Sequence, residues 1–335
     1  MNDKNVNRNT QDGVSVIITV NDKAGIIKEN LEYFLDQDYP NYEVIIVDEC
    51  SEDDTQDVLT DMQRKYPHLK TTRIFPGAIF RSTKKLAINL GVVAAQYDII
   101  LFSEITCRPA TRNWIKTMAG YFTGKTVAVI GYANYATLRG LDFPRMFRFM
   151  HYIETFFLVR AKCYVAGEGF NMGFRKQHFL ADNIFSNNAQ TYSGYDSKIV
   201  KAISKHGSVR VVRDTEGNIQ IGDFARQVWT DGMAYYYHDK RAWTFLPFFF
   251  ANWQRIVRWA VYVLSLYMLS NELFVPYNVA IIGFTFITNV IVMNISRKHI
   301  KQTSLIFTSL FFCLLGFIPR WYYSFHSVLT HKKWR

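Results

Sequence analysis

Four short apolar runs, separated by stretches of helical character, most limit how this chain can fold. The runs are rich in β-branched residues: VSVIITV at 14–20, YEVIIVD at 42–48, TTRIF at 71–75 and YDIILFS at 97–103. Helical stretches lie between most of them, at 28–37, 55–66 and 84–96. Strands that alternate with helices favour a parallel sheet covered by helices on both faces. We therefore predict an α/β fold for the first third of the chain.

Polar and acidic residues follow three of these predicted strands. They are Asn21-Asp22, the segment 48–55 and the segment 103–106. Ligands of such sheets bind at the carboxyl ends of the strands, so we expect a binding site at this edge. Asp53 or Asp54 suits a helix N-cap, because the next predicted helix begins near Thr55. Capping does not explain the adjacent carboxylates of Asp48 and Glu49, for which a base and ribose are reasonable hydrogen-bonding partners.

Residues 127–240 contain two further informative segments. GEGFNMGFRKQHF at 167–179 has three glycines, which permit close approach of the backbone. In TYSGYDSKIVKAISKHG at 191–207, Asp196 stands at the start of an amphipathic helix with Ile199, Val200 and Ile203 on one face. Spacing alone leaves two roles open for Asp196, a helix N-cap or a functional carboxylate.

The C-terminal third is apolar enough to enter a membrane. From Trp259 to Ile295 the only charged residue is Glu272, and a spanning helix needs about 20 apolar residues. We predict two spans, near 256–272 and 275–295. A third apolar segment near 303–319 is expected to be shallow or re-entrant, with a full crossing as the alternative. Residues 142–160 are too charged to span, so they form either an interfacial helix or a helix packed on the sheet.

Basic residues beside these segments predict their orientation. They are Arg255 and Arg258 before the first span, and Arg297, Lys298 and Lys301 after the second. By the positive-inside rule both flanks are cytoplasmic and the turn at Glu272 is outside. The terminal residues Lys332, Lys333 and Arg335, together with an aromatic belt at 320–323, favour the shallow third segment.

The amino-acid composition limits the kinds of molecule that this protein is expected to bind. A formal net charge of +11 suits a nucleic acid, an anionic membrane surface or a phosphorylated substrate. Much of the basic surplus lies near the apolar segments, so anionic lipid explains it better than nucleic acid. The four cysteines form no C-x-x-C pair, which argues against zinc and disulfides and for reduced thiols. The polar residues 1–12 lack the apolar region of a signal peptide.

Taken in order, these segments resemble a family-2 glycosyltransferase of the GT-A fold. The resemblance rests on VSVIITVND, DQDYPNYEVIIVDECSEDDT, KKLAINLGVVAAQYDIILFSEITCRPATRNWI, and GFNMGFRK followed by GYD. It covers about 14–240 and implies a Rossmann-like nucleotide-diphospho-sugar transferase domain with a mostly parallel sheet at 13–240. Within it, a nucleotide-binding part would occupy 13–126 and an acceptor part 127–240. A polar tail at 1–12 and a membrane region at 241–335 complete the predicted organisation.

The resemblance also implies site residues. The nucleotide-sugar donor would contact Thr19, Asn21, Asp22, Asp48, Glu49, Lys84, Lys85, Ser103 and Glu104. The sugar and acceptor site would include Asn171, Met172, Arg175, Tyr195 and Gln227. Asp48 resembles the carboxylate that hydrogen-bonds the base. Asp196 resembles the general base, which would deprotonate an acceptor hydroxyl as it attacks C1 and so invert the anomeric configuration.

The metal motif departs from the family pattern. Glu104-Ile105-Thr106 stands where the family has Asp-x-Asp. Glu104 keeps an oxygen ligand suited to Mg²⁺ or Mn²⁺, whereas Thr106 offers only a neutral hydroxyl. The leaving diphosphate must be stabilised by a metal or by fixed cations. A divalent cation at Glu104 is thus one expectation, and a metal-independent reaction that uses Lys84, Lys85 or Arg175 is the other.

Two further family positions differ. Tyr195 replaces the first member of the family's Glu-Asp pair, which leaves Asp196 alone. The family's Gln-x-x-Arg-Trp pattern is expected near Gln227, where the sequence reads QVWTD. Residues 254–259 have the right residue types but fit a membrane-entry helix with basic and aromatic anchors.

The resemblance therefore implies a membrane-bound, inverting glycosyltransferase of the hexosyltransferase type. Its partners would be a UDP- or GDP-sugar donor, a lipid-linked or membrane-presented acceptor, and membrane lipids, with no nucleic acid. We expect a multi-pass protein of the cytoplasmic membrane, with the catalytic domain facing the cytoplasm and a role in bacterial-type cell-envelope glycan synthesis. The alternative is a catalytically degenerate GT-A scaffold that acts as a binding or partner subunit.

Overall fold

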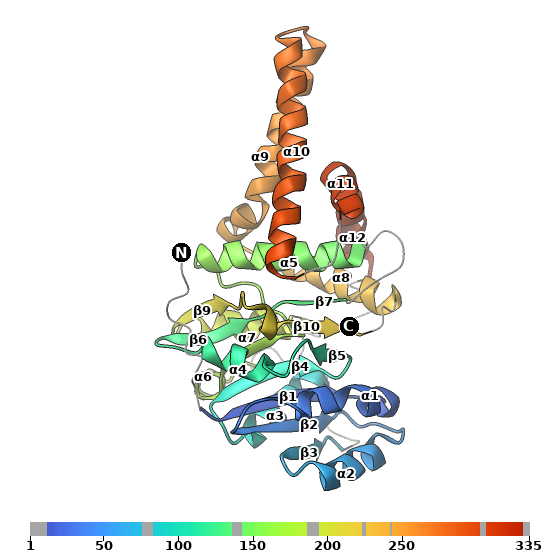
Figure 1. Ribbon diagram of the computed structural model, residues 1–335, viewed down its shortest axis with the longest axis vertical. Coiled ribbons are helices and arrows are strands. Elements are labelled where there is room, and N and C mark those ends of the chain that lie inside the picture. Colours follow the sequence, from blue (N-terminus) through green and yellow to red (C-terminus); the bar gives the residue numbers. More distant parts are fainter. Residues whose placement is uncertain are drawn as a thin grey trace. The chain divides into compact units, whose positions relative to one another are not determined.

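Two units make up the computed structural model of this chain (Figure 1). The sheet unit comprises residues 1–136 and 164–224, and the helical unit comprises residues 137–163 and 225–335. The structure describes residues 12–75, 83–135, 143–185, 194–222, 226–241, 243–301 and 306–330. This division differs from the domain boundary expected at 240, because residues 143–160 and 226–241 group with the C-terminal helices.

A seven-stranded sheet organises the sheet unit. Its order is β3 (Leu69–Arg73), β2 (Tyr42–Asp48), β1 (Val14–Val20), β4 (Ile99–Glu104), β8 (Met172–Arg175), β6 (Thr126–Ile130) and β9 (Ser208–Val211). β8 is antiparallel to both of its neighbours, and the other neighbours are parallel. Every residue of β1 is buried, as expected for a strand covered on both faces. The predicted α/β class with a mainly parallel sheet is confirmed.

The first strands lie close to their predicted positions. β1 and β2 begin and end at the predicted residues, whereas β4 begins two residues later than predicted, at Ile99, and ends one residue later, at Glu104. β3 was predicted at 71–75 but begins at Leu69, which pairs with Val44 and is buried. Pairing with β2 therefore sets where β3 begins and ends, and the positions of the apolar residues in β3 do not.

Three helices connect these strands. They are α1 (Ala24–Leu35), α2 (Thr55–Lys65) and α3 (Thr83–Ala94). The chain steps outward from β1 to β2 to β3 and then returns past β1 to β4. Right-handed crossovers therefore put α1 and α2 on one face of the sheet and α3 on the other. In agreement, α1 packs against α2, and α3 packs on β1 and β2. These connections leave the carboxyl ends of β1, β2 and β4 together at one edge.

A second, three-stranded sheet begins directly after β4. It consists of β5 (Cys107–Pro109), β10 (Ile219–Ile221) and β7 (Ala133–Tyr135), in that order. The turn at 104–106 therefore links the two sheets. The sheet unit also contains α4 (Trp114–Gly120), α6 (Lys176–Ala181), α7 (Tyr195–Ile203) and a 3₁₀ helix, η2 (Thr215–Gly217). In α7, Ile199, Val200 and Ile203 are all buried, which confirms the predicted amphipathic face.

The helical unit contains six helices in its described residues. They are α5 (Phe143–Arg160), α8 (Arg226–Arg241), α9 (Phe245–Ser270), α10 (Val275–His299), α11 (Ile306–Leu315) and α12 (Phe317–Thr330). α9 and α10 run side by side as the long pair in Figure 1. α12 packs against α8, and α5 packs against α9 and α11.

Within the part of the chain that the structure describes, one helix is long and apolar enough to cross a membrane. This helix is α10, whose 25 residues reach about 37 Å, more than the ~30 Å of a hydrocarbon core. The span predicted at 256–272 lies in α9. Every 18-residue stretch of α9 contains Gln254, Arg255 and Arg258, which lowers its hydropathy. The structure thus offers one candidate span where two were predicted.

The third apolar segment does not form one continuous helix. α11 ends at Leu315, and Gly316 separates it from α12. The 10 residues of α11 reach about 15 Å, roughly half of the hydrocarbon core. The shallow arrangement and the full crossing both stay predictions. Residues 1–11, 302–305 and 331–335, which include Lys332, Lys333 and Arg335, lie outside the described residues.

Candidate active site

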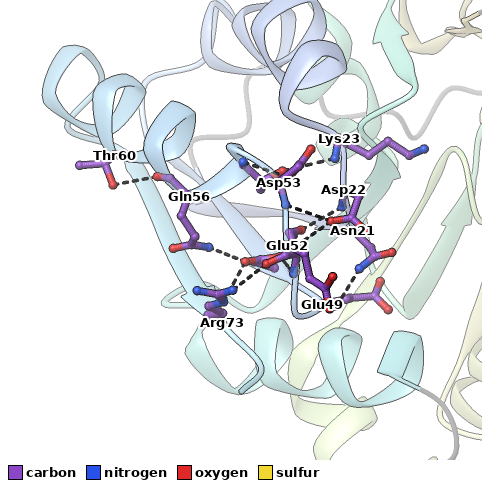
Figure 2. A network of polar contacts seen from close by, with 12 residues as sticks. Asn21, Asp22, Lys23, Glu49, Glu52, Asp53, Gln56, Thr60 and Arg73 are labelled. Carbon is purple, nitrogen blue, oxygen red and sulfur yellow. Dashed lines mark hydrogen bonds and ion pairs between the residues drawn. The ribbon is translucent and has the colours of Figure 1, made fainter. Parts of the chain in front are cut away.

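The acidic loop after β2 is tied to the loop after β1 by hydrogen bonds (Figure 2). Asp22 accepts hydrogen bonds at Oδ1 from the backbone N–H groups of Glu52 (2.8 Å) and Asp53 (3.4 Å). Asp53 accepts from the backbone N–H groups of Ala24 and Thr55, the first residues of α1 and α2. A hydrogen bond from the Thr55 side chain, followed by these backbone groups, holds the pKa of Asp53 below its usual value. Asp22 and Asp53 therefore shape the loops.

Asp48 is fully buried, and its own chain surrounds its carboxylate. Oδ1 accepts hydrogen bonds from the backbone N–H (2.9 Å) and the hydroxyl of Ser51. Oδ2 accepts from the Gln56 side chain and lies 3.3 Å from Arg73 Nε. The next-but-one residue, Cys50, has a positive φ of 64°, so the chain turns sharply here. Asp48 thus connects the loop to α2 and β3, and its predicted contact with a base stays a prediction.

Two polar groups at this edge have no partner among the described residues. The Thr19 hydroxyl, near the end of β1, is buried and makes no hydrogen bond. The Glu49 carboxylate makes none either, although the Glu49 carbonyl accepts a 3.0 Å bond from the Asn21 side chain. Thr19 is the register partner of Glu104, so the hydroxyl lies beside the end of β4. An unpaired buried hydroxyl and a free carboxylate are groups that a ligand can satisfy.

Glu104 forms the centre of a second cluster. Its Oε1 accepts a hydrogen bond from Lys84 Nζ at 3.2 Å and another from the Tyr195 hydroxyl at 3.1 Å. The side chains of Lys84 and Glu104 are each 26% exposed, so a ligand can reach them. Lys84 Nζ also lies 5.9 Å from the ring centre of Phe102 and 5.8 Å from that of Tyr195. The ammonium group is thus held at the carboxyl end of β4.

Tyr195 lies among three carboxylates. Burial, followed by the charges of Glu104, Asp196 and Glu168, raises the pKa of Tyr195 well above its usual value. The phenol therefore stays protonated and donates to Glu104. Gly169 makes room for it, because a Cβ there would lie 2.4 Å from the Tyr195 hydroxyl. We did not predict Glu168, and its position between two glycines of the 167–169 segment was the available signal.

Asp196 lies in the first turn of α7 and does not cap it. The N-cap is Gly194, at a φ of 69°. Asp196 Oδ2 accepts the backbone N–H of Gly169 at 3.1 Å, and Oδ1 accepts that of Ser197 at 2.8 Å. A Cβ on Gly167 would lie 2.4 Å from the carbonyl carbon of Asp196, so this glycine permits the approach. Backbone groups thus orient the carboxylate beside Tyr195.

Arg175 was predicted at the acceptor site, and the structure places it elsewhere. β8 runs antiparallel to β4, so Arg175 pairs with Ile99 at the opposite end of that strand from Glu104. Its guanidinium binds Asp98 at 2.9 Å and the Thr126 carbonyl at 3.1 Å. Lys85 also points away from the site, with Nζ buried 5.8 Å from the ring centre of Phe185. Lys84 alone of the predicted cations reaches Glu104.

The remaining predicted residues support the site from within the core. Asn171 is fully buried. Its side-chain oxygen accepts a hydrogen bond from the Trp114 indole, and its side-chain nitrogen donates to the carbonyls of Tyr132 and Gly217. Met172 is buried in β8, and Ser103 donates to the Phe170 carbonyl at 2.8 Å. These residues hold the 167–175 segment against β4. Gln227 lies in α8 of the helical unit, and its side chain is outside the described part of the structure.

The residues at 104–106 do not make up a divalent-cation site by themselves. No group of three His, Cys, Asp or Glu side chains in the described ranges is arranged to hold a metal. Glu104 is the single carboxylate of the motif, and one of its oxygens already faces an ammonium group. The Thr106 carbonyl accepts the backbone N–H of Gly222 at 2.7 Å, which ties the turn to the end of β10.

The fold and these residues agree with a comparison against protein families. Residues 2–171 match the model of glycosyl transferase family 21. The chain belongs to glycosyl transferase family 21. The family is of the GT-A type, so the predicted fold and the predicted glycosyltransferase class are confirmed, although the segments had suggested family 2. A search of curated protein sequences found no match to this chain.

Solved structures share the fold of this glycosyltransferase at low sequence identity. Mannosyltransferase PcManGT from Pyrobaculum calidifontis, in complex with GDP-Man and Mn²⁺, is 15% identical with a TM-score of 0.55. The similarity covers 94% of this chain and 90% of that one. The S. aureus TarS fragment 1–349 is 15% identical over 95% of this chain and 80% of that one, with a TM-score of 0.50. These likenesses concern the fold alone.

Proposed function

We propose that this family 21 glycosyltransferase moves a sugar from a nucleotide-sugar donor to a hydroxyl group of a lipid-linked or membrane-presented acceptor, with inversion at C1. The observation that supports this most is the cluster of Lys84, Glu104, Tyr195 and Asp196 at the carboxyl edge of the sheet. It combines a cation, a protonated phenol and an oriented carboxylate. A sugar transfer from a diphosphate needs a base for the acceptor hydroxyl and positive charge beside the leaving group.

The donor would bind across the ends of β1, β2 and β4. The Thr19 hydroxyl would donate a hydrogen bond to the nucleoside or accept one from it, and the Glu49 carboxylate would accept one. A GDP- or UDP-sugar is the proposed class, and the GDP-Man complex of PcManGT is consistent with it. Asp48 would contribute by holding the loop after β2 in place. Direct contact with the base would require the base to displace Ser51, Gln56 or Arg73 from the carboxylate.

Asp196 is the proposed general base. The two backbone N–H groups that bind its carboxylate fix its orientation. An acceptor hydroxyl within hydrogen-bond reach would lose its proton to Asp196 as its oxygen attacks C1. Attack from the face opposite the diphosphate breaks the C1–O bond and inverts the configuration.

The leaving diphosphate gains negative charge as that bond breaks. Lys84 is the proposed group that stabilises it, since its ammonium is partly exposed and already held at the motif position. When donor is bound, the diphosphate would take over the hydrogen bond that Lys84 now gives to Glu104. A divalent cation remains the alternative for this charge, and the experiment below separates the two.

The base assignment is tested with full-length protein purified in detergent. Release of nucleoside diphosphate from a panel of UDP- and GDP-sugars is measured with and without a lipid extract as acceptor. Asp196→Asn should lower the rate by about 10² or more, in the range of a lost general base. The matched control is Asp61→Asn, because Asp61 is exposed on α2. Full activity in Asp196→Asn would reject the assignment.

The role of Lys84 is tested in the same assay. With EDTA present, wild-type protein should keep its activity, whereas Lys84→Met should lose most of it. Lys116→Met on the exposed face of α4 serves as the control. Activity abolished by EDTA, restored by Mn²⁺ and unchanged in Lys84→Met would assign the charge to a metal instead.

A binding or partner subunit without catalysis is the second candidate. It is favoured by Glu104, which is already paired with a cation, and by Tyr195 and Thr106 at positions where the sequence resemblance expects carboxylates. Calorimetry with the nucleotide panel distinguishes the two. Nucleotide binding without any diphosphate release under all conditions would support the subunit, and release of diphosphate would exclude it.

The proposed location is the cytoplasmic membrane, with the sheet unit on the cytoplasmic side and a role in cell-envelope glycan synthesis. α10 is the candidate span, and Arg297 and Lys298 in its last turn provide the positive charge of a cytoplasmic end. A sheet unit on the same side as Arg297 and Lys298 requires a second span in α9, which would make the protein multi-pass. An acceptor with a lipid tail would then be reached from the membrane surface.

A further inference from the structure

A buried carboxylate in the helical unit forms ion pairs with cations from two other helices. Glu154 of α5 is 8% exposed. Its Oε1 pairs with Lys240 of α8, and its Oε2 lies 2.9 Å from a terminal nitrogen of Arg255 in α9. The hydroxyl of Tyr236 donates to the same carboxylate at 3.3 Å. Although burial opposes ionisation, Lys240 and Arg255 hold the pKa of Glu154 below its usual value. The carboxylate is therefore charged and fully paired.

A third cation, Arg320 of α12, lies in the same cluster without an anion of its own. Its guanidinium lies 4.9 Å from the ring centre of Phe312 and 5.8 Å from that of Phe147. Within the described part of the chain it makes no hydrogen bond and no ion pair. Burial, and then the charge of Arg255, lower the pKa of Arg320 to about 10. Its surroundings thus disfavour the positive charge, which the carboxylate of Glu154 offsets only in part.

The charges of this cluster do not balance. Three cationic side chains, Lys240, Arg255 and Arg320, share the single carboxylate of Glu154. Burial also lowers the pKa of Lys240 to about 8. Charges removed from water are stable only when paired. A purely structural ion pair between helices would account for Glu154 and one or two cations, and it leaves Arg320 unexplained.

An anion of the right shape would complete the cluster. A guanidinium group gives two parallel hydrogen bonds to phosphate oxygens, and an ammonium group adds a third contact. Phe147 and Phe312 already lie against the Arg320 guanidinium, so less side-chain entropy is lost on binding. Lys240 and Arg255 are 11% and 23% exposed, and Arg320 is also incompletely buried, so the cations can be reached from outside.

The surroundings favour a membrane source for this anion. α12 exposes apolar and aromatic side chains at helical spacing, on Ile318, Trp321, Tyr322, Phe325 and Val328. Tyr and Trp side chains are enriched at the depth of lipid headgroups. We propose that Lys240, Arg255 and Arg320 form a binding site for a phosphate group, of the class carried by anionic lipid headgroups and by free phosphoesters. This site is independent of the proposed transferase site.

The test uses full-length protein in a neutral detergent, with binding measured by calorimetry and by thermal shift. The two probes are inorganic phosphate and dihexanoyl phosphatidic acid, and the neutral dihexanoyl glycerol controls for the acyl chains. Wild-type protein should bind both phosphate compounds and not the neutral lipid. Tighter binding of phosphatidic acid identifies the headgroup as the source, and equal binding identifies a free phosphoester.

Arg320→Gln should weaken phosphate binding at least tenfold, whereas Arg226→Gln, an exposed arginine of α8, should not. Arg320→Lys keeps the charge and should restore part of the affinity, which separates binding from folding. If Arg320→Gln does not fold, Arg320→Lys and the wild type still decide the question. Equal affinity of the wild type and Arg320→Gln, or no phosphate binding by the wild type, would overturn the proposal.

Discussion

Tyr195 shows how one side chain connects two segments that are far apart in the sequence. Its hydroxyl donates to Glu104 at the end of β4, while its backbone begins the helix that carries Asp196. The neighbouring carboxylates and burial keep the phenol protonated. Tyr195 therefore joins the end of β4 to the start of α7, and it shares the orientation of Glu104 with Lys84.

The space for Tyr195 depends on Gly169, and Gly169→Ala tests this. The new Cβ would lie 2.4 Å from the Tyr195 hydroxyl, so the ring must move and its bond to Glu104 must break. We expect diphosphate release to fall at least tenfold, with a small loss of thermal stability. Gly25→Ala is the control, since nothing lies within 4 Å of a Cβ there. Equal activity of the two variants would show that the Tyr195–Glu104 bond is dispensable.

Adjacent residues of the site differ in ways that the sequence alone does not reveal. Lys84 and Lys85 are neighbours in α3, yet Lys84 reaches Glu104 and Lys85 is buried against Phe185. Successive helical side chains point about 100° apart, so the alignment of the helix on the sheet decides which lysine faces the site. The identity of the strand-end residues could be predicted, and their partners could not.

At the scale of elements, long and fully buried strands were predicted well. β1 and β2 combine seven consecutive apolar-rich residues with clear flanking turns. The short strands β5, β7 and β10 have three residues each and were not predicted. Their pairing joins residues 86 to 114 positions apart, so no local pattern encodes it. The turn at 104–106 could be placed from the sequence, but the second sheet that holds it could not.

The first three strands are linked by a buried carboxylate, Glu43 of β2. It accepts hydrogen bonds from the Ser15 hydroxyl and the Gln96 backbone N–H, both at 2.6 Å, and pairs with Lys70 of β3 at 2.5 Å. Burial alone would raise the pKa of Glu43, but these donors outweigh it and lower the pKa below 4.5. Ionised Glu43 therefore stabilises the fold above about pH 4.5, and this contribution disappears as the pH falls through the lowered pKa.

Glu43→Gln should lower the free energy of unfolding by about 2 kcal/mol at pH 7, because charged hydrogen bonds are lost in a buried site. The difference between the variant and wild type should shrink as the pH falls below 4. Thermal unfolding from pH 3 to pH 7 measures both effects. Glu52→Gln, an exposed residue of the acidic loop, is the control. A stability difference that does not depend on pH would contradict the role of the ionised carboxylate.

At the scale of the whole molecule, the chain combines a sheet unit with a helical unit that is interleaved in sequence. Residues 143–160 leave the sheet unit and α5 packs with α9 and α11 before the chain returns at 164. Hydropathy identified the apolar helices, but it could not show that α5 and α8 belong to the same unit as those helices. That grouping depends on contacts such as the pair between Glu154 and Arg255, which are 101 residues apart.

The membrane orientation can be measured through the turn between α9 and α10. In cells that express the chain with Cys50→Ser, Glu272→Cys should react with a membrane-impermeant maleimide added from outside, because Glu272 is exposed in that turn. Lys301→Cys, after α10, should react only when the cells are opened. Labelling of both positions in intact cells, or of neither, would contradict a span across α10 with its basic end inside.

The turn between β4 and β5 has a consequence for how this site can change. Its path is fixed by groups outside its own side chains: Asn30 donates to the Ile105 carbonyl at 2.7 Å, and Gly222 donates to the Thr106 carbonyl. The backbone is thus preorganised whatever residues stand at 104 and 106. Replacing either side chain alters the charge presented to a ligand without refolding the strand end. Folding and chemistry are therefore separable at these two positions, and selection can act on one without disturbing the other.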